Sequence, residues 1–245
     1  MVSREPVLLI VAADRRELAG IARVASGETL ARPAGGRERA GLERVELGLE
    51  WSRLGRLREW KIVLAANGAG RANAAQVVQK VAGEFAIGGV VSTGLCGGLT
   101  PQINPGAVVV ADRLISLSPA VEFAPLRPRK TPKERTELWS GAVLTVDYVA
   151  QSSAEKQRLR STGALAVEME AAGVAAEAQK RGLSFFCIKV TSDSADESFC
   201  LDYNRARRPD GRFSSIRLIA QAGLRPASWR ELLAWRGRMT AAAAV

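Results

Sequence analysis

Short apolar runs that alternate with helical patterns constrain the fold of this chain more than any other feature of its sequence. Val78, Val81 and Phe85 recur at the three- and four-residue spacing of a helix face. Alternation of apolar strands with such helices predicts an α/β fold, a single-domain three-layer sandwich in which helices flank a mixed central β-sheet. The runs that we expect to form strands lie at residues 7–13, 60–66, 87–92, 107–111, 142–146, 164–167 and 184–190.

Local signals predict the segments between these runs. Asp14 directly follows the first run and is predicted to cap a short helix that ends near Val24. A weaker alternation predicts a strand at residues 45–51. Glycine, proline and basic residues predict exposed connections at 27–45 and 117–138. Further helices are expected at residues 154–160 and from Met169 onward.

Length and cysteine content bound the class of protein. With 245 residues, 47% of them hydrophobic, the chain is long enough for one large core. No apolar run approaches the roughly 18 to 20 residues of a membrane span, and the start lacks the pattern of a secretory signal. Three scattered cysteines favour reduced thiols and a cytoplasmic protein. We expect one domain, with residues 1–200 as its main body and 201–245 as a basic C-terminal helical extension.

The positive charge of the chain is concentrated near its end. The net charge is +10, and residues 205–245 hold nine arginines against two acidic residues. Such a segment fits a nucleic acid, a membrane surface or merely a solvated basic face. No zinc pattern, basic zipper or aromatic-rich RNA-binding strand is present, so we expect no nucleic-acid partner. Apolar residues that share one side of a helical wheel favour peripheral binding at the inner membrane, although Arg236 interrupts them: Trp229, Leu232, Leu233, Trp235 and Met239.

The chain contains no histidine, which removes several kinds of active site at once. Ser-His-Asp triads, Cys-His dyads and histidine metal sites are all excluded. The leading acid and base candidates are therefore carboxylates. Two acidic clusters lie just over twenty residues apart, Glu168 with Glu170 at a predicted helix start and Asp193 with Asp196 after a predicted strand. Without further support, a helix-opening acidic pair and a loop cap are the favoured explanations of these residues.

Two glycine-rich turns follow predicted strands, where α/β sheets present their ligand sites. Residues 68–71 open a helix, so their free amides and Arg71 would suit an anion. This turn matches neither the P-loop nor the dinucleotide-binding pattern, and an ordinary tight turn explains it as well. Residues 93–99 are more informative, because Gly94, Gly97 and Gly98 permit close backbone approach to a ligand. A sharp bend between two buried strands is the simpler explanation of that segment.

Considered together, four segments resemble the purine nucleoside phosphorylase and nucleosidase superfamily. The resemblance covers most of the chain from Val7 to about Glu197 and implies a nucleoside phosphorylase-like fold. It also implies an enzyme that acts on a small-molecule nucleoside, as an N-glycosidase or a nucleoside phosphorylase, and that forms a homo-oligomer. The segments lie at residues 92–99, 104–110, 166–171 and 190–196.

The resemblance also implies roles for individual residues. Asp193 would protonate the departing purine as a general acid. Glu17 aligns with the glutamate that activates water in methylthioadenosine nucleosidases. Glu170 would bind the ribose 2′- and 3′-hydroxyls and Met169 would pack against the sugar. The remaining residues assigned to substrate binding are Glu168, Gly94, Val149 and Lys189.

Departures from the family pattern bear on the reaction. Nucleosidases that cleave methylthioadenosine have a serine in place of Leu95 and an arginine in place of Lys189, which puts that substrate in doubt. Phosphorylases have a Gly-Asp-Pro-x-Arg type of loop for phosphate. This chain has a carboxylate, Glu17, near the corresponding position, which favours hydrolysis over phosphorolysis. We expect no cofactor and no metal, with phosphate as a co-substrate only if the enzyme is a phosphorylase.

A closer resemblance concerns the hopanoid-associated phosphorylase branch, which implies adenosylhopane, a membrane-embedded adenine nucleoside, as the substrate. Two alternatives remain, a soluble enzyme of purine salvage and a non-catalytic nucleoside or lipid sensor. Retention of Glu17, Glu170 and Asp193 together weighs against the sensor. The segments that carry the closer resemblance lie at residues 145–147, 154–156, 162–167, 208–212 and 225–226.

Overall fold

The computed structural model describes residues 3–26, 41–128, 137–223, 228–231 and 237. Most of the predicted 27–45 connection, the centre of the predicted 117–138 connection and residues 224–227, 232–236 and 238–245 of the basic tail lie outside the described residues. The predicted apolar helix face therefore falls largely outside them, with Leu232, Leu233, Trp235 and Met239. Within the described ranges, no helix has both the length and the apolar character needed to cross a bilayer.

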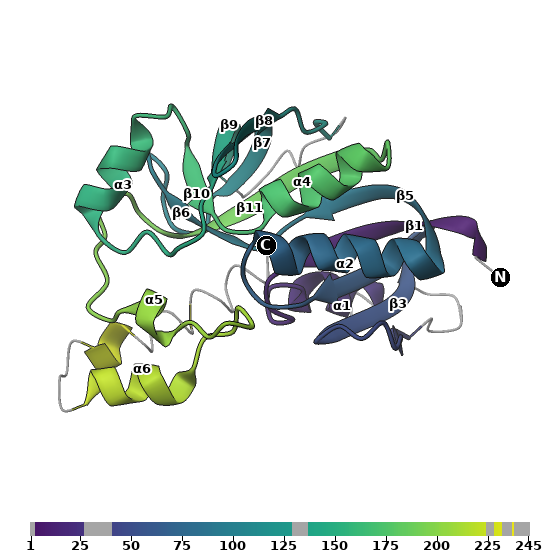
Figure 1. Ribbon diagram of the computed structural model, residues 1–245, viewed down its shortest axis with the longest axis horizontal. Coiled ribbons are helices and arrows are strands. Elements are labelled where there is room, and N and C mark those ends of the chain that lie inside the picture. The colour runs from purple at the N-terminus through teal and green to yellow at the C-terminus, as the bar shows by residue number, and fades with distance from the viewer. Residues whose placement is uncertain (1–2, 27–40, 129–136, 224–227, 232–236, 238–245) are drawn as a thin grey trace, which may run out of the picture.

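A mixed β-sheet forms the centre of the molecule, as the sequence predicts (Figure 1). Strand β1 (Ser3–Ala12) lies between β4 (Trp60–Ala66) and β5 (Phe85–Ser92), parallel to both. Strand β11 (Phe185–Asp193) is parallel to β5 and extends the sheet. Towards the other edge, β3 (Trp51–Leu57) pairs antiparallel with β4.

The second half of the sheet closes on itself, because β11 pairs with strands on both of its sides. The closed ring runs from β11 through β6, β10, β9 and β7 and back to β11. Leu99, Leu144 and Val167 from this half of the molecule belong to one cluster of buried residues. The further strands are β2 (Glu43–Arg44), β6 (Leu95–Gly98), β7 (Val108–Leu117), β8 (Ala120–Phe123), β9 (Leu138–Thr145) and β10 (Ala166–Glu168).

Helices cover both faces of the first half of the sheet, which gives the predicted three layers. Leu9 and Val11 of β1 belong to the core cluster that includes α2 (Arg71–Glu84) and α4 (Ala171–Lys180). Ile10 points the other way, into the cluster around α1 (Ala19–Ala25). The remaining helices are α3 (Ser153–Arg160), α5 (Tyr203–Ala206) and α6 (Ser215–Ala222), of which α5 and α6 form a small lobe at one end (Figure 1).

Four local predictions were wrong. Asp14 does not cap the first helix, because the residue before α1 is Leu18 and the Asp14 carboxylate instead accepts hydrogen bonds from Arg16. Residues 45–50 lie between strands β2 and β3. The predicted 117–138 connection contains strand β8, and the glycine-rich turn at 93–99 contains strand β6. Both are edge or short strands whose pairing depends on distant segments, so local patterns do not predict them.

The central position of β1 gives a prediction about stability. Leu9 of β1 is fully buried in the core cluster that includes α2 and α4. Leu9→Ala should therefore lower the free energy of unfolding by about 2–5 kcal/mol. Val24→Ala is the matched control, because Val24 is 54% exposed and should change stability by less than about 0.5 kcal/mol. Urea denaturation followed by circular dichroism measures both; equal effects would contradict the proposed core.

Candidate active site

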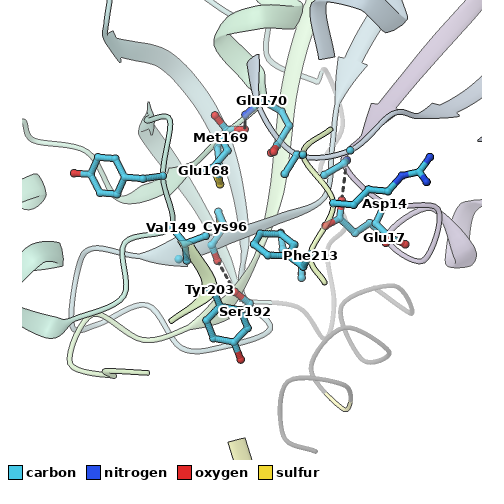
Figure 2. A pocket seen from close by; sticks show the side chains of 18 of the residues that line it. Asp14, Glu17, Cys96, Val149, Glu168, Met169, Glu170, Ser192, Tyr203 and Phe213 are labelled. Carbon is cyan, nitrogen blue, oxygen red and sulfur yellow. Dashed lines mark hydrogen bonds between the residues drawn. The ribbon is translucent and has the colours of Figure 1, made fainter. Parts of the chain in front are cut away.

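A cavity of about 320 Å³ opens at the carboxyl ends of the strands. Its walls include residues that follow β1, β4 and β10, residues of β6 and the end of β11. Ligand sites of α/β sheets typically lie at this edge. Figure 2 shows Glu17, Met169, Glu170 and Phe213 converging on it from different elements. The volume lies within the range of small-molecule sites.

Glu17 lies against the glycine-rich segment. Its Oε2 accepts a hydrogen bond from the Ala13 amide at 3.1 Å. A Cβ on Gly94 would lie 2.4 Å from the same oxygen, and Gly94 has a φ of +113°, so the position requires glycine. Gly94 thus makes room for the Glu17 carboxylate, whereas the sequence prediction gave it a contact with substrate. Burial first, and Glu170 second, raise the pKa of Glu17 to about 8.

Glu170 lies just before α4 and also lines the cavity. Its Oε1 accepts a hydrogen bond from the Gly70 amide at 3.0 Å, which joins the two predicted motifs 100 residues apart. Burial raises the pKa of Glu170 to about 7, although Lys189 opposes this shift. Met169 precedes it, is buried and lines the same cavity.

Glu168 and Lys189 form a buried ion pair behind these groups. Lys189 Nζ lies 2.9 Å from Glu168 Oε2 and 3.9 Å from Glu170 Oε2, and it donates to the Thr93 carbonyl. Burial alone would lower the pKa of Lys189, but Glu168 and Glu170 outweigh it and raise that pKa. Lys189 does not line the cavity, so it supports the carboxylates rather than contacting a bound molecule.

The Glu168 carboxylate is also occupied by the backbone. Its Oε2 accepts from the amides of Glu170 and Ala171, and its Oε1 from the Thr145 hydroxyl. These bonds satisfy free amides at the start of α4. Glu168 therefore fixes the segment that presents Glu170, while one part of it still borders the cavity.

Asp193 ends β11 and is held on both oxygens. Ser192 Oγ donates to Oδ1 and Lys156 Nζ donates to Oδ2, each at 2.5 Å. A Cβ on Gly97 would lie only 3.0 Å from Oδ2, so this glycine leaves space for the carboxylate. Asp193 is buried and lines the same cavity as Glu17 and Glu170.

The C-terminal lobe supplies an apolar wall that sequence reasoning missed. Phe199, Tyr203, Phe213 and Leu218 line the cavity and belong to or pack against one hydrophobic cluster. Val149 faces them, and its amide and carbonyl are bound by the Asn204 side chain. The only sequence signal was the spacing of aromatic residues after Asp193, which by itself does not distinguish a site from a core.

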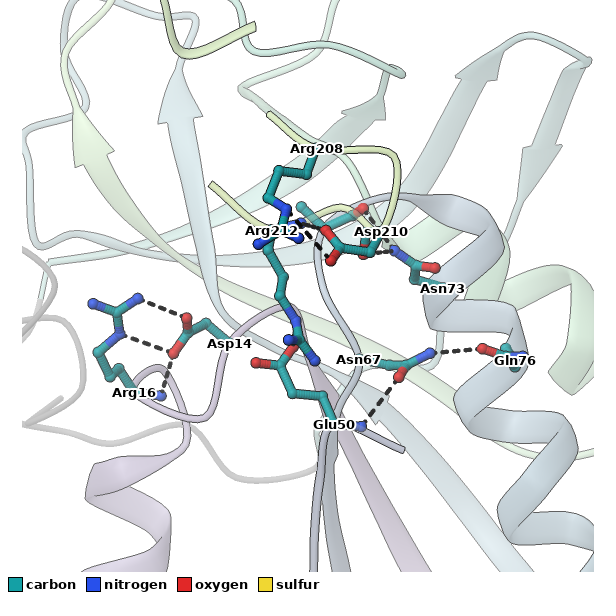
Figure 3. Close-up of polar contacts among 10 residues, drawn as sticks. Asp14, Arg16, Glu50, Asn67, Asn73, Gln76, Arg208, Asp210 and Arg212 are labelled. Carbon is teal, nitrogen blue, oxygen red and sulfur yellow. Dashed lines mark hydrogen bonds and ion pairs between the residues drawn. The ribbon is translucent and has the colours of Figure 1, made fainter. Parts of the chain in front are cut away.

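The arginines that line the cavity are paired with acidic residues. Arg16 pairs with Asp14, and Arg212 with Glu50. Figure 3 shows the Arg16–Asp14 pair and, apart from it, Arg212 next to Glu50 and the turn in which the Asp210 carbonyl accepts a hydrogen bond from Asn73.

Arg71, predicted to bind an anion, does not line the cavity. It forms a bidentate pair with Asp147, at 2.9 and 2.7 Å, and also donates to Ser116. This arrangement leaves the proposed anion role without support.

Among the side chains that line the cavity, the carboxyl groups are the main candidates for acid and base chemistry. Cys96 lines it, but burial raises the pKa of its thiol, so it is not poised as a thiolate nucleophile. No group of three or more acidic or cysteine side chains that would hold a metal occurs in the part of the chain that the structure describes. Among the described lining residues, three carboxyl groups from distant segments, Glu17, Glu170 and Asp193, meet at this cavity.

Comparisons with known proteins agree with this geometry. Residues 9–210 match the family model described as the phosphorylase superfamily. A 5′-methylthioadenosine/S-adenosylhomocysteine nucleosidase of Mycobacterium bovis is 26% identical over 195 residues, which cover 62% of this chain and 76% of that protein.

Two solved structures share the fold. The nucleosidase of the same name from Neisseria meningitidis, in complex with methylthio-immucillin-A, has a TM-score of 0.66 and 20% identity, covering 97% of this chain and 96% of its own. Futalosine hydrolase from Helicobacter pylori has a TM-score of 0.67 and 18% identity, covering 97% and 94%.

The raised pKa of Glu17 predicts a pH-dependent stability. Its pKa lies at about 8 in the folded protein against an ordinary 4.5, so its contribution to stability is present below pH 4.5 and lost as the pH rises through about 8. Glu17→Gln should therefore gain thermal stability relative to the unmodified protein at pH 9 but not at pH 5. Thermal melts at both pH values measure this, with the exposed Glu84→Gln as control; a pH-independent difference would refute the assignment.

Proposed function

Since this chain belongs to the phosphorylase superfamily, we propose that it hydrolyses the N-glycosidic bond of an adenine nucleoside. The observation that carries this proposal is the convergence of Glu17, Glu170 and Asp193 on one cavity. N-glycosidic cleavage needs an acid for the leaving base and a base for the water. The name of the Mycobacterium bovis relative, an adenine-nucleoside nucleosidase, supports the choice of substrate class.

In the proposed reaction, the bond between the ribosyl carbon and the purine breaks as a water oxygen bonds to that carbon. Asp193 gives its proton to the purine ring, so the base leaves without carrying a negative charge. Glu17 takes a proton from the water. Because the pKa of Glu17 is about 8, its carboxylate is a stronger base than an ordinary glutamate. Protons exchanged with solvent then restore both groups.

Glu170 and Met169 orient the sugar in this scheme. Glu170 Oε1 is already bound by the Gly70 amide, so its position is fixed before a substrate arrives. The remaining Oε2 accepts hydrogen bonds from ribose hydroxyls, and buried Met169 packs on the sugar face. Val149 and the aromatic wall of the C-terminal lobe surround the base and the 5′-substituent.

Hydrolysis is favoured over phosphorolysis by charge. The two basic residues among the described cavity lining, Arg16 and Arg212, are paired with Asp14 and Glu50. Glu17 and Glu170 add carboxyl groups rather than cations to the same cavity. A dianion gains nothing from such a site, whereas a neutral water molecule suffers no repulsion.

We further propose adenosylhopane as the substrate. Two features support a large apolar 5′-substituent presented at a membrane. The apolar wall of Phe199, Phe213 and Leu218 lies in the C-terminal lobe. On the outer side of α6, Ile216 is 81% exposed and Ile219 is 50% exposed, next to Arg217. Such a face binds anionic lipid surfaces.

The proposal extends to the basic tail and to the organisation of the chain. Residues 201–245 would form one extension of the catalytic domain, which holds the enzyme peripherally at the inner membrane. A homo-oligomer is also proposed. The alternative is a soluble salvage enzyme that cleaves methylthioadenosine or a related nucleoside, which the relatives' names favour.

Asp193→Asn tests the chemistry. Loss of a general acid should lower the turnover number by roughly two or more orders of magnitude, measured as adenine release by liquid chromatography. Glu17→Gln should abolish release in phosphate-free buffer. Near-native turnover by folded Asp193→Asn would contradict the acid role, and phosphate-dependent activity in Glu17→Gln would indicate a phosphorylase.

A substrate panel tests the finer proposal. Adenosylhopane in detergent, methylthioadenosine and adenosine are compared for adenine release, and we expect adenosylhopane to have the highest kcat/KM. Ile216→Ser with Ile219→Ser should weaken sedimentation with anionic liposomes without changing cleavage of a soluble nucleoside. Preference for methylthioadenosine and no liposome binding would instead support the salvage enzyme.

A further inference from the structure

Lys156 is a fully buried lysine that the proposed chemistry does not use. It lies on α3, has no exposed surface and does not line the cavity. Lysine is rarely buried unless its charge is paired, since leaving water costs an ammonium several kcal/mol. The neighbouring basic residues of α3, Arg158 and Arg160, are exposed. The burial of Lys156 therefore requires a specific partner for its charge.

That partner is Asp193. Lys156 Nζ lies 2.5 Å from Asp193 Oδ2, and its other protons reach the carbonyl oxygens of Ser194 at 2.7 Å and Glu197 at 3.0 Å. The ammonium also lies 5.3 Å from the centre of the Phe199 ring. All three donors of the ammonium are thus used on the segment that carries Asp193.

These contacts fix the orientation of the Asp193 carboxylate. Lys156 holds Oδ2, while Ser192 Oγ holds Oδ1. Gly97 lies against the same carboxylate, so the side chain has little freedom to rotate. An acid that is oriented before the substrate binds loses no free energy in being oriented during the reaction.

Charge adds a second effect. If Asp193 protonates the purine, it changes from a neutral acid to a carboxylate during the step. The attraction to the Lys156 ammonium therefore grows as the proton leaves, and it acts on the transition state more than on the bound substrate. Burial strengthens this effect, because water does not screen the pair.

We propose that Lys156 is a positioning residue that orients Asp193 and stabilises the carboxylate formed as its proton passes to the purine. This inference rests on the proposed function, in which Asp193 is the acid. Lys189 has a different task, because it faces Glu168 and Glu170 and not Asp193. The two buried lysines therefore pair with different carboxylates of the site.

The test compares Lys156→Met with Arg160→Met, an exposed basic residue of the same helix. Lys156→Met should lower kcat for adenine release by about 10- to 100-fold, with a change in KM of less than about threefold, as for loss of a charge that acts on the transition state. Arg160→Met should leave both constants within about twofold. Thermal melts establish that each variant is folded.

A double-mutant cycle separates positioning from structure. In the Asp193→Asn background, Lys156→Met should cost less than about threefold, because the two residues act as a unit. An equal loss in both backgrounds, or unchanged kcat in the single variant, would overturn the proposal. Full activity of Asp193→Asn alone would instead overturn the proposed function.

A second variant and a measurement on the unmodified side chain guard against misfolding. Lys156→Gln keeps neutral donors for the Ser194 and Glu197 carbonyls but removes the charge, and it should show the same loss of kcat. If neither variant folds, nuclear magnetic resonance spectra of ¹⁵N-labelled lysine, recorded for the unmodified protein and for Asp193→Asn, test whether Lys156 is paired with Asp193. A slowly exchanging Lys156 ammonium signal that moves on this substitution is expected, and an unmoved signal would overturn the pairing.

Discussion

The ion pair between Lys189 and Glu168 is the interaction on which the site depends. It lies at the centre of the fold, with both side chains fully buried. Through Glu168 it fixes the amides of Glu170 and Ala171 at the start of α4, and through the Thr93 carbonyl it reaches the glycine-rich segment. Removing either partner would leave a buried charge unpaired, which typically costs about 3–5 kcal/mol.

Around this ion pair, carboxyl groups outnumber the buried lysines. Four carboxylates gather here, Glu17, Glu168, Glu170 and Asp193, and the lysines buried beside them, Lys156 and Lys189, are each engaged with one side. The excess negative charge adds to burial in raising the pKa of Glu17 and Glu170. Because Arg16 and Arg212 of the described lining are also paired with acidic residues, the cavity offers an anionic co-substrate little unpaired positive charge.

Parts of this architecture were predictable from local sequence because their signals are local. The apolar run at β1 needs no distant partner to be recognised as a strand, and the acidic segment around Glu170 follows directly from the order of residues. Lys156 could not be recognised in the same way. Its burial depends on Asp193, which is 37 residues away, and on carbonyls that no side-chain pattern reveals. The strand predicted at 45–51 failed similarly, because pairing with β4 begins only at Trp51.

The C-terminal lobe shows how a shared fold acquires a site of its own. The family match ends at residue 210, yet Phe213, Ser215 and Leu218 line the cavity. The carboxylates that would carry the chemistry lie within the matched region, on strand ends fixed by the sheet. The apolar wall lies partly beyond it, and its helices join the rest through contacts such as that of Asn204 with Val149. If the proposed roles hold, the acid and base lie within the matched region while part of the wall that would surround the substrate lies beyond it, so substitutions in the lobe should alter which nucleoside fits without moving Asp193 or Glu17.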